Sequence, residues 1–212
     1  MIKTLTACTN EIDDVDLAVS EILDQLDLKN NQCKNSVGIL TCYSEFIDTG
    51  VVKALCEKLP FDVAGTTTIG NAGSSVFGQM MLCVSVLTSD DVSFSTVVSD
   101  SIVNEQMEPL SRAYAEAASA ADKKPAMLIT FAPLVRHVAG DHIVSVLNSI
   151  SGNVPNFGTV ALDHNIDYHD AQTIYNGEAF KDRLVLILVF GDINPRFLLL
   201  PFPKRKSRNS GQ

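Results

Sequence analysis

The segment Val37-Gly38-Ile39-Leu40-Thr41-Cys42 decides the fold, because a similar apolar run returns 89 positions later as Ala126-Met127-Leu128-Ile129-Thr130-Phe131. The apolar run Met81–Leu87 returns 103 positions later as Leu184–Phe190. The growing offset is what a duplicated unit with lengthened loops would produce. A repeat of about a hundred residues is too long for a solenoid. The sequence therefore predicts two copies packed as one domain, with a pseudo-symmetric cleft between them.

The composition is typical of a globular chain with a substantial core, since 46% of the residues are hydrophobic and 19% are charged. The net charge of −9 argues against nucleic acid or an anionic membrane surface as the main partner. No segment approaches the ~18 continuous apolar residues of a membrane span. The N-terminus lacks the basic and then apolar pattern of a signal peptide.

The cysteines indicate a reduced protein. There are five, an odd number, and no two of them form a C-x-x-C pair. Cys42, Cys56 and Cys83 lie in apolar runs, where a free cysteine acts as a small hydrophobic residue. We therefore expect a cytoplasmic protein.

Each copy is predicted to supply a strand, a helix, a second strand, a second helix and then a pair of strands. The second strand of each copy is a continuous apolar run, as in strands that are covered on both faces. The final pairs are predicted to be two hairpins, Met80–Leu87 with Val92–Val98 and Arg183–Phe190 with Pro195–Phe202. The predicted fold class is α/β, with mixed sheets from two pseudo-symmetric β-α-β-α-β-β repeats packed as one domain.

The segment Gly65-Thr66-Thr67-Thr68-Ile69-Gly70-Asn71 follows an apolar strand and resembles the G-x-S-T-x-G-E motif of the FIST domain family. The later elements Asn176-Gly177-Glu178 and Gly191-Asp192 are also similar to that family. The resemblance covers residues 1–202 and implies a FIST N-terminal domain, with internal repeats at about 1–100 and 101–202. Residues 203–212 would then be a basic linker or the artificial end of the chain.

The resemblance implies an intracellular, non-catalytic sensory domain. Its signalling partner would be a histidine kinase, a diguanylate cyclase, a chemoreceptor or a C-terminal companion domain, and in eukaryotes an F-box protein. Its ligand would be a small molecule such as an amino acid. The sequence departs from the motif at Asn71, where the family has glutamate. If that glutamate binds a cationic ligand group in relatives, this chain would bind a different ligand or bind more weakly.

The candidate ligand-binding residues lie in the corresponding turns of the two copies. Both copies have Gly-Thr at the end of a strand, an edge where α/β sheets often bind ligands, so Thr66 and Thr159 are predicted to face each other across the cleft. The region after Gly158 is ten residues longer than its counterpart, and long loops often carry binding groups. The candidate residues are Thr66, Thr67, Thr68, Gly70, Asn71, Gly158, Thr159, Asp163, His164 and Asn165.

A metal site is not predicted, and two alternative functions remain open. Asp163–Asp170 lacks the glycine and glutamate of a calcium loop, and its two histidines lack a clear third zinc ligand, so no metal site is predicted. A subset of the FIST family resembles haem-binding nitric-oxide sensors, and His137 or His142 would be the axial ligand. A small-molecule hydrolase or transferase has little support, because Gly-x-Ser-x-Gly and the phosphate-binding loop ending G-K-[ST] are absent.

Overall fold

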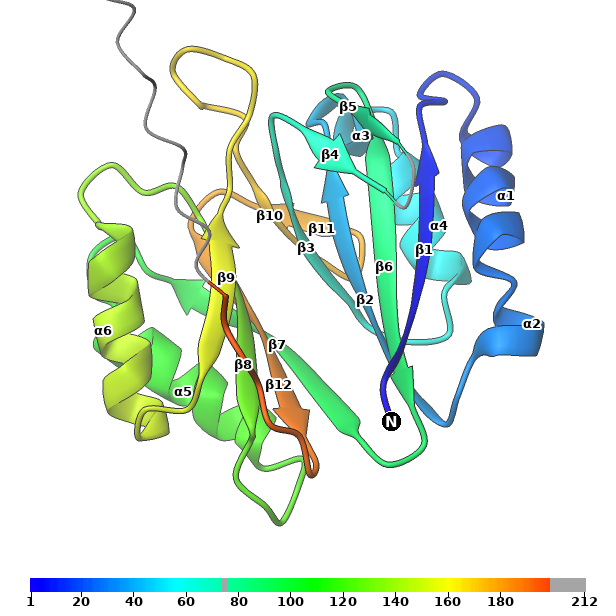
Figure 1. Cartoon of the computed structure of the whole chain (residues 1–212). Helices are drawn as coiled ribbons and strands as arrows, with labels where there is room; N and C mark the ends of the chain where they lie inside the picture. The colour runs from blue at the N-terminus through cyan, green and yellow to red at the C-terminus, as the bar shows by residue number, and fades with distance from the viewer. Residues whose placement is uncertain (74–75, 199–212) are drawn as a thin grey trace, which may run out of the picture.

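Two mixed β-sheets pack face to face, and helices cover the outer side of each (Figure 1). This computed structural model describes residues 1–73 and 76–198. The first sheet has the strand order β1 (Lys3–Thr9), β6 (Leu82–Ser89), β2 (Asn35–Cys42), β3 (Val63–Thr67), β10 (Thr173–Tyr175) and β11 (Glu178–Phe180). The second has the order β7 (Ser93–Ser101), β12 (Arg183–Phe190), β8 (Met127–Ala132) and β9 (Asn156–Val160).

The helices that lie outside the first sheet come from the first half of the chain, and those outside the second sheet come from the second half (Figure 1). The first group is α1 (Val15–Leu26), α2 (Leu28–Asn31), α3 (Glu45–Asp48) and α4 (Val51–Lys58), and the second is α5 (Met107–Ala118) and α6 (Gly140–Ser151). Each described helix is too short or too polar to cross a lipid bilayer.

The strand order β1-β6-β2-β3 returns as β7-β12-β8-β9. The pairs β2–β3 and β8–β9 are parallel, whereas the other strand pairs are antiparallel. The predicted fold class is therefore confirmed: the protein is α/β, with mixed sheets built from two pseudo-symmetric halves.

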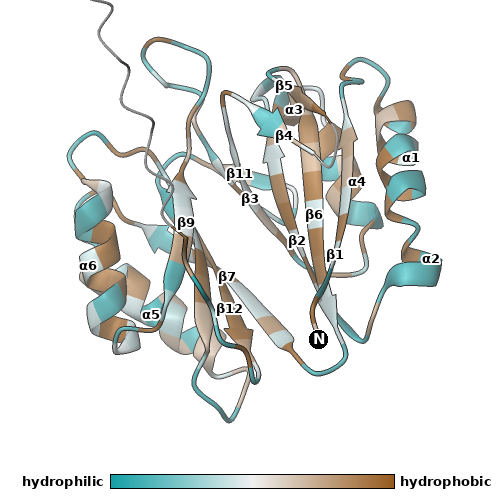
Figure 2. Ribbon diagram, viewed as in Figure 1, coloured by the Kyte–Doolittle hydropathy of each residue, from teal (hydrophilic) through white to brown (hydrophobic). Residues whose placement is uncertain are grey.

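Hydrophobic clusters fill the three spaces between the four layers. The α1 stripe Ala18, Val19, Ile22 and Leu26 packs on the first sheet, and the Asp14 side chain caps the helix by accepting from Leu17 N. Apolar residues gather on the inner strands of both sheets, and polar residues colour the outer helix faces (Figure 2). Every residue of β2 and β8 is buried or half-buried, as their apolar runs predicted, whereas the edge strand β9 is largely exposed.

A pair of glycines fixes which residues correspond in the two halves. A Cβ atom on Gly65 of β3 would lie 1.9 Å from the carbonyl oxygen of Leu40, and one on Gly158 of β9 would lie 2.2 Å from that of Thr130. In the structure Leu40 of the first half therefore corresponds to Thr130 of the second half. The sequence alignment of the two copies, with its offset of 89 residues, had matched Leu40 to Ile129 instead. The offset of 103 is also wrong by one residue, because Leu40 pairs with Val84 and Thr130 pairs with Leu186. A slip of one residue exchanges the two faces of a strand.

Both predicted hairpins at the ends of the copies are wrong. β6 and β7 follow each other closely in the chain but lie in different sheets, and β7 pairs with β12. Residues 195–198 form no strand, and residues 199–202 of the predicted second hairpin lie outside the described residues. The strand after Asp91 is thus the first strand of the second sheet, in the position that β1 has in the first.

The hairpin β10–β11 joins the two halves, because it comes from the second half of the chain and pairs with β3. Its turn is Asn176-Gly177, and both residues have positive φ angles, of 49° and 86°. The Asn176 side chain accepts a hydrogen bond from Val63 N and donates one to Asp62. These bonds hold the hairpin against the first sheet.

Candidate functional site

β1, β2 and β3 all run in the same direction, since β1 and β2 are both antiparallel to β6 and β3 is parallel to β2. Their carboxyl ends meet at one edge of the first sheet, where α/β proteins commonly bind ligands. The loop of residues 161–172, between β9 and β10, reaches this edge from the second half.

Thr66 and Thr67 are buried at the end of β3 and are bonded to that loop. Thr66 donates a hydrogen bond to Gln172 O, and the Thr67 hydroxyl accepts one from Gln172 N. Leu162 N also donates to Thr67 O. These two threonines thus attach the loop to β3, and their hydroxyl groups are already engaged.

Thr66 and Thr159 lie on the inner faces of their sheets. Ala64, two residues before Thr66, belongs to the core between the sheets, and so does Phe131, the partner of Thr159 in the β8–β9 pair. Thr159 is exposed, and its hydroxyl donates to Val160 O. Thr66 bonds to the loop, and no hydrogen bond joins the two threonines in the described part of the chain.

Tyr43 and His164 form the side-chain contact between the halves at this edge. The Tyr43 hydroxyl lies 2.9 Å from His164 Nε2, and the ring centroids are 4.4 Å apart. Partial burial raises the pKa of Tyr43, and the nearby charges of Glu45 and Asp163 raise it further. The phenol therefore keeps its proton at neutral pH and can donate it to the imidazole.

Asp163 closes the long loop. It is buried, and its two carboxylate oxygens accept hydrogen bonds from Asn165 N and Asp170 N. Two other polar side chains lie close to it. One carboxylate oxygen of Asp163, one carboxylate oxygen of Asp170 and one ring nitrogen of His169 all lie within 4.8 Å of one another. Since backbone amides already satisfy Asp163, loop closure accounts for its burial.

The turn after β3 brings Thr68, Gly70 and Asn71 next to the strand ends. The Thr68 hydroxyl donates to Gly70 O, and its amide donates to Cys42 O. Asn71 is buried and donates to Met81 O, while its Oδ1 atom has no hydrogen-bond donor among the described residues. Asn71 thus retains an unused acceptor inside the protein.

Gly158 lies away from these residues, in a second cavity of about 370 Å³ between β9 and α6. Because its Cβ position is blocked by Thr130 O, close approach of β9 to β8 explains this glycine. The proposed haem ligands His137 and His142 are exposed on the loop before α6 and on its first turn. An axial haem ligand lies in an apolar pocket, so the surroundings of these two histidines do not fit haem.

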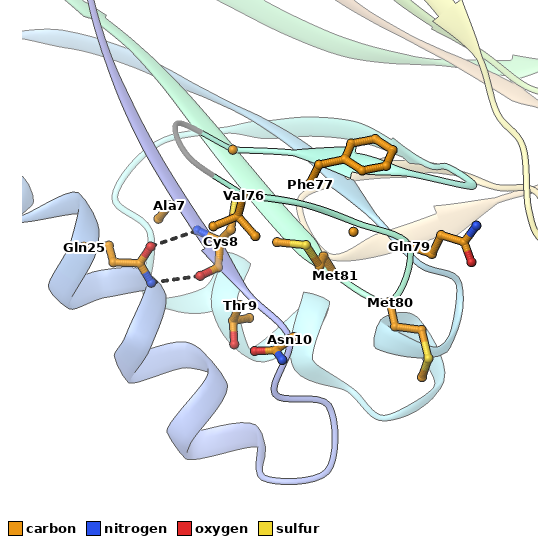
Figure 3. Close-up of a pocket in the computed structure, with 12 residues that line it drawn as sticks. Ala7, Cys8, Thr9, Asn10, Gln25, Val76, Phe77, Gln79, Met80 and Met81 are labelled. Carbon is orange, nitrogen blue, oxygen red and sulfur yellow. Dashed lines mark hydrogen bonds between the residues drawn. The ribbon is translucent and has the colours of Figure 1, made fainter.

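A groove of about 460 Å³ opens at the carboxyl end of β1 (Figure 3). We call it the strand-end groove. Its walls come from β1, from α1 and from the segment that contains β4 (Asn71–Ala72) and β5 (Phe77–Gly78). The lining residues are Ala7, Cys8, Thr9, Asn10, Gln25, Gly73, Val76, Phe77, Gly78, Gln79, Met80 and Met81.

Gln25 fixes one wall of the groove, because its side-chain amide makes two hydrogen bonds with the backbone of Cys8 (Figure 3). Met81 connects the groove to the rest of the edge. Its carbonyl oxygen accepts hydrogen bonds from Tyr43 N and from the Asn71 side chain. A change at Met81 would therefore reach Tyr43 and, through it, His164 of the second half.

The sequence-based candidates do not include any residue that lines the strand-end groove. One signal was available: the exposed apolar residues Val76, Phe77 and Met80 follow a glycine-rich turn, where solvent-exposed side chains are normally polar.

The expectation that Cys83 is a free buried thiol is wrong. Cys83 in β6 forms a disulfide with Cys8, its direct partner in β1.

Comparisons with known proteins give one family and distant structural neighbours. Residues 36–198 match the family model of the FIST N domain. No curated protein matches the chain. A cyanuric acid hydrolase described as an evolutionary innovation by structural concatenation is similar in structure, with 9% identity and a TM-score of 0.46 over 90% of this chain and 68% of that chain. A cyanuric acid hydrolase from A. caulinodans has 9% identity and a TM-score of 0.44 over 88% and 70%.

Proposed function

The chain belongs to the FIST N domain family, whose domains are sensory modules of signal transduction, and we propose on this basis that it is a non-catalytic sensory domain that binds a small ligand in the strand-end groove. The observation that carries this proposal is the position and size of the groove. It lies at the carboxyl ends of strands, and its volume of about 460 Å³ is in the range of small-molecule sites.

The lining of the groove favours a small molecule with both polar and apolar parts. Phe77, Met80 and Met81 supply apolar surface, and Asn10 and Gln79 supply amide groups. The described lining residues include no charged side chain, which disfavours a ligand of high net charge such as a nucleotide, whereas the zwitterion of a free amino acid has no net charge. A free amino acid with an apolar side chain fits these properties.

The signal would pass from the groove to the second half through Met81, Tyr43 and His164. A ligand that binds one arrangement of the segment around Met81 more tightly shifts the population toward that arrangement. The proposed receiver is a histidine kinase, a diguanylate cyclase, a chemoreceptor or a C-terminal companion domain. We propose the cytoplasm as its location because the family resemblance implies an intracellular domain; the Cys8–Cys83 disulfide removes the argument from reduced cysteines.

A thermal-shift experiment with each of the twenty free amino acids at millimolar concentration tests the ligand class. A ligand present at a hundred times its Kd stabilises the folded state by about 2.7 kcal/mol. For a domain of this size, that raises Tm by about 5–10 °C. If none of the amino acids raises Tm, this ligand class is wrong.

Three tryptophan variants then locate the ligand. Asn10→Trp fills the mouth of the groove from an exposed position and should abolish the shift. Asp24→Trp adds the same side chain at an exposed position of α1 outside the groove and should leave the shift unchanged. Loss of the shift in Thr68→Trp alone would place the ligand at the end of β3 and contradict the groove.

A further inference from the structure

The disulfide in the wall of the strand-end groove joins two strands that are already paired. Cys8 and Cys83 are direct partners in the β1–β6 register, which extends from Lys3 to Thr9 on β1. The Gln25 side chain also holds the backbone of Cys8 on its other side. Because the ladder and Gln25 hold Cys8 independently, the bond between the sulfurs can open without separating the strands.

Access to the two sulfurs is unequal. Cys8 is half-buried and lines the groove, whereas Cys83 does not line it and is only 6% exposed. A small thiol that enters the groove therefore reaches Cys8. Gly73 lies against the same sulfur, since a Cβ atom at that position would come within 2.4 Å of Cys8 Sγ. Gly73 itself places no side chain against the sulfur, and a larger residue at this position would collide with it.

We propose that the strand-end groove is also a site of thiol–disulfide exchange, in which a small thiol such as glutathione reduces the Cys8–Cys83 bond. The proposal does not depend on the ligand proposed above. Thiolate attack on Cys8 Sγ forms a mixed disulfide and releases the Cys83 thiolate, which takes up a proton. A second thiol molecule attacks the mixed disulfide, frees Cys8 and leaves as the oxidised dimer. Two electrons pass from two thiols to the protein, and the reverse reaction with the oxidised dimer restores the bond.

Two of the remaining cysteines are poorly suited to take part. Burial raises the pKa of Cys42 far above its ordinary value. Burial, together with the charge of Glu57, raises the pKa of Cys56 to about 12. Thiolates are the reactive form, so both side chains stay unreactive at neutral pH. Cys42 and Cys56 therefore do not compete with the Cys8–Cys83 pair for exchange.

The first test measures reduction of the folded wild-type protein. The protein is equilibrated in glutathione buffers of increasing reducing power, alkylated and mapped by mass spectrometry, while circular dichroism monitors the fold. We expect Cys8 and Cys83 to become alkylated together in folded protein, and oxidised glutathione to reverse this. A bond that opens only after unfolding in urea, or a pair already alkylated in oxidising buffer, would overturn the proposal.

Single-cysteine variants test which sulfur is attacked. Incubated with oxidised glutathione, Cys83→Ser should form a mixed disulfide at Cys8, whereas Cys8→Ser should leave Cys83 unmodified because that thiol is buried. In the wild-type background, Asn10→Trp should slow reduction several-fold and Asp24→Trp should not. Modification at Cys83 instead of Cys8, or equal rates in the two tryptophan variants, would contradict entry through the groove.

Discussion

Replacing Gly65 by alanine tests the close strand approach that defines the fold. The added Cβ atom would lie 1.9 Å from the carbonyl oxygen of Leu40, whereas real Cβ contacts essentially never fall below 3.0 Å. β2 and β3 must therefore separate by about 1 Å, which stretches their hydrogen bonds beyond the normal range. Losing about three such bonds at about 1 kcal/mol each lowers the free energy of unfolding by about 3 kcal/mol. Both strands lie inside the sheet, so neither can move away freely.

Urea unfolding followed by circular dichroism measures this loss, and with a slope of about 1–3 kcal/mol/M the midpoint should fall by about 1–3 M. Gly158→Ala meets Thr130 O at 2.2 Å, but β9 is an edge strand and can move outward, so we expect a loss of only about 1 kcal/mol. Gly140→Ala is the control, because its nearest contact is an ordinary 3.7 Å. Equal losses for Gly65→Ala and Gly158→Ala, or no loss for Gly65→Ala, would refute this reasoning.

Three further predictions concern single side chains. Asn71→Asp removes the donor to Met81 O and buries a carboxylate, so the free energy of unfolding should fall by about 2–3 kcal/mol in urea titrations, and an unchanged midpoint would contradict the buried bond. Asn176→Ala removes the acceptor for Val63 N and should speed hydrogen exchange of that amide, while the α6 amides exchange as before. The pKa of Cys56 is raised to about 12, so the stability that its neutral form supplies is complete below pH 9 and is lost as the pH rises from about 9 to 12. Cys56→Ala should flatten this alkaline decline in urea midpoints, and an equally steep decline would contradict the assignment.

The apolar runs predicted the strands and the duplicated order of elements, but they could not fix the correspondence between the halves. Strands buried on both faces carry no alternation of polar and apolar residues, so Leu40 aligns equally well with Ile129 or Thr130. Only a contact between strands, the approach of Gly158 to Thr130 O, decides between them. The β6–β7 hairpin failed for a similar reason, since a short connection does not reveal that the chain has moved to another sheet.

The sequence places the candidate residues at the same edge of the sheet as the strand-end groove, but on different side chains. Gly65 and Gly158 stood out in the sequence because they repeat, yet a repeated glycine here reflects repeated strand packing. The groove is formed where β1 meets a segment about seventy residues away, and such proximity has no local signature. The Asn176-Gly177 turn was visible, but its docking on β3 depends on contacts across the two halves.

The asymmetry between the halves has a structural reason that also bears on signalling. In the first half, the segment after β3 forms β4–β5 and one wall of the groove, whereas in the second half the corresponding segment forms β10–β11 and pairs with β3. With the second half counted from β7 onward, and not from about residue 101 as predicted, the first sheet contains strands from both halves, while the second sheet contains strands from the second half alone. A displacement at the end of β3 therefore acts on the loop of residues 161–172 through Thr67 and Gln172. If the groove binds a ligand as we propose, that attachment and the contact between Tyr43 and His164 are two routes by which the second half can respond.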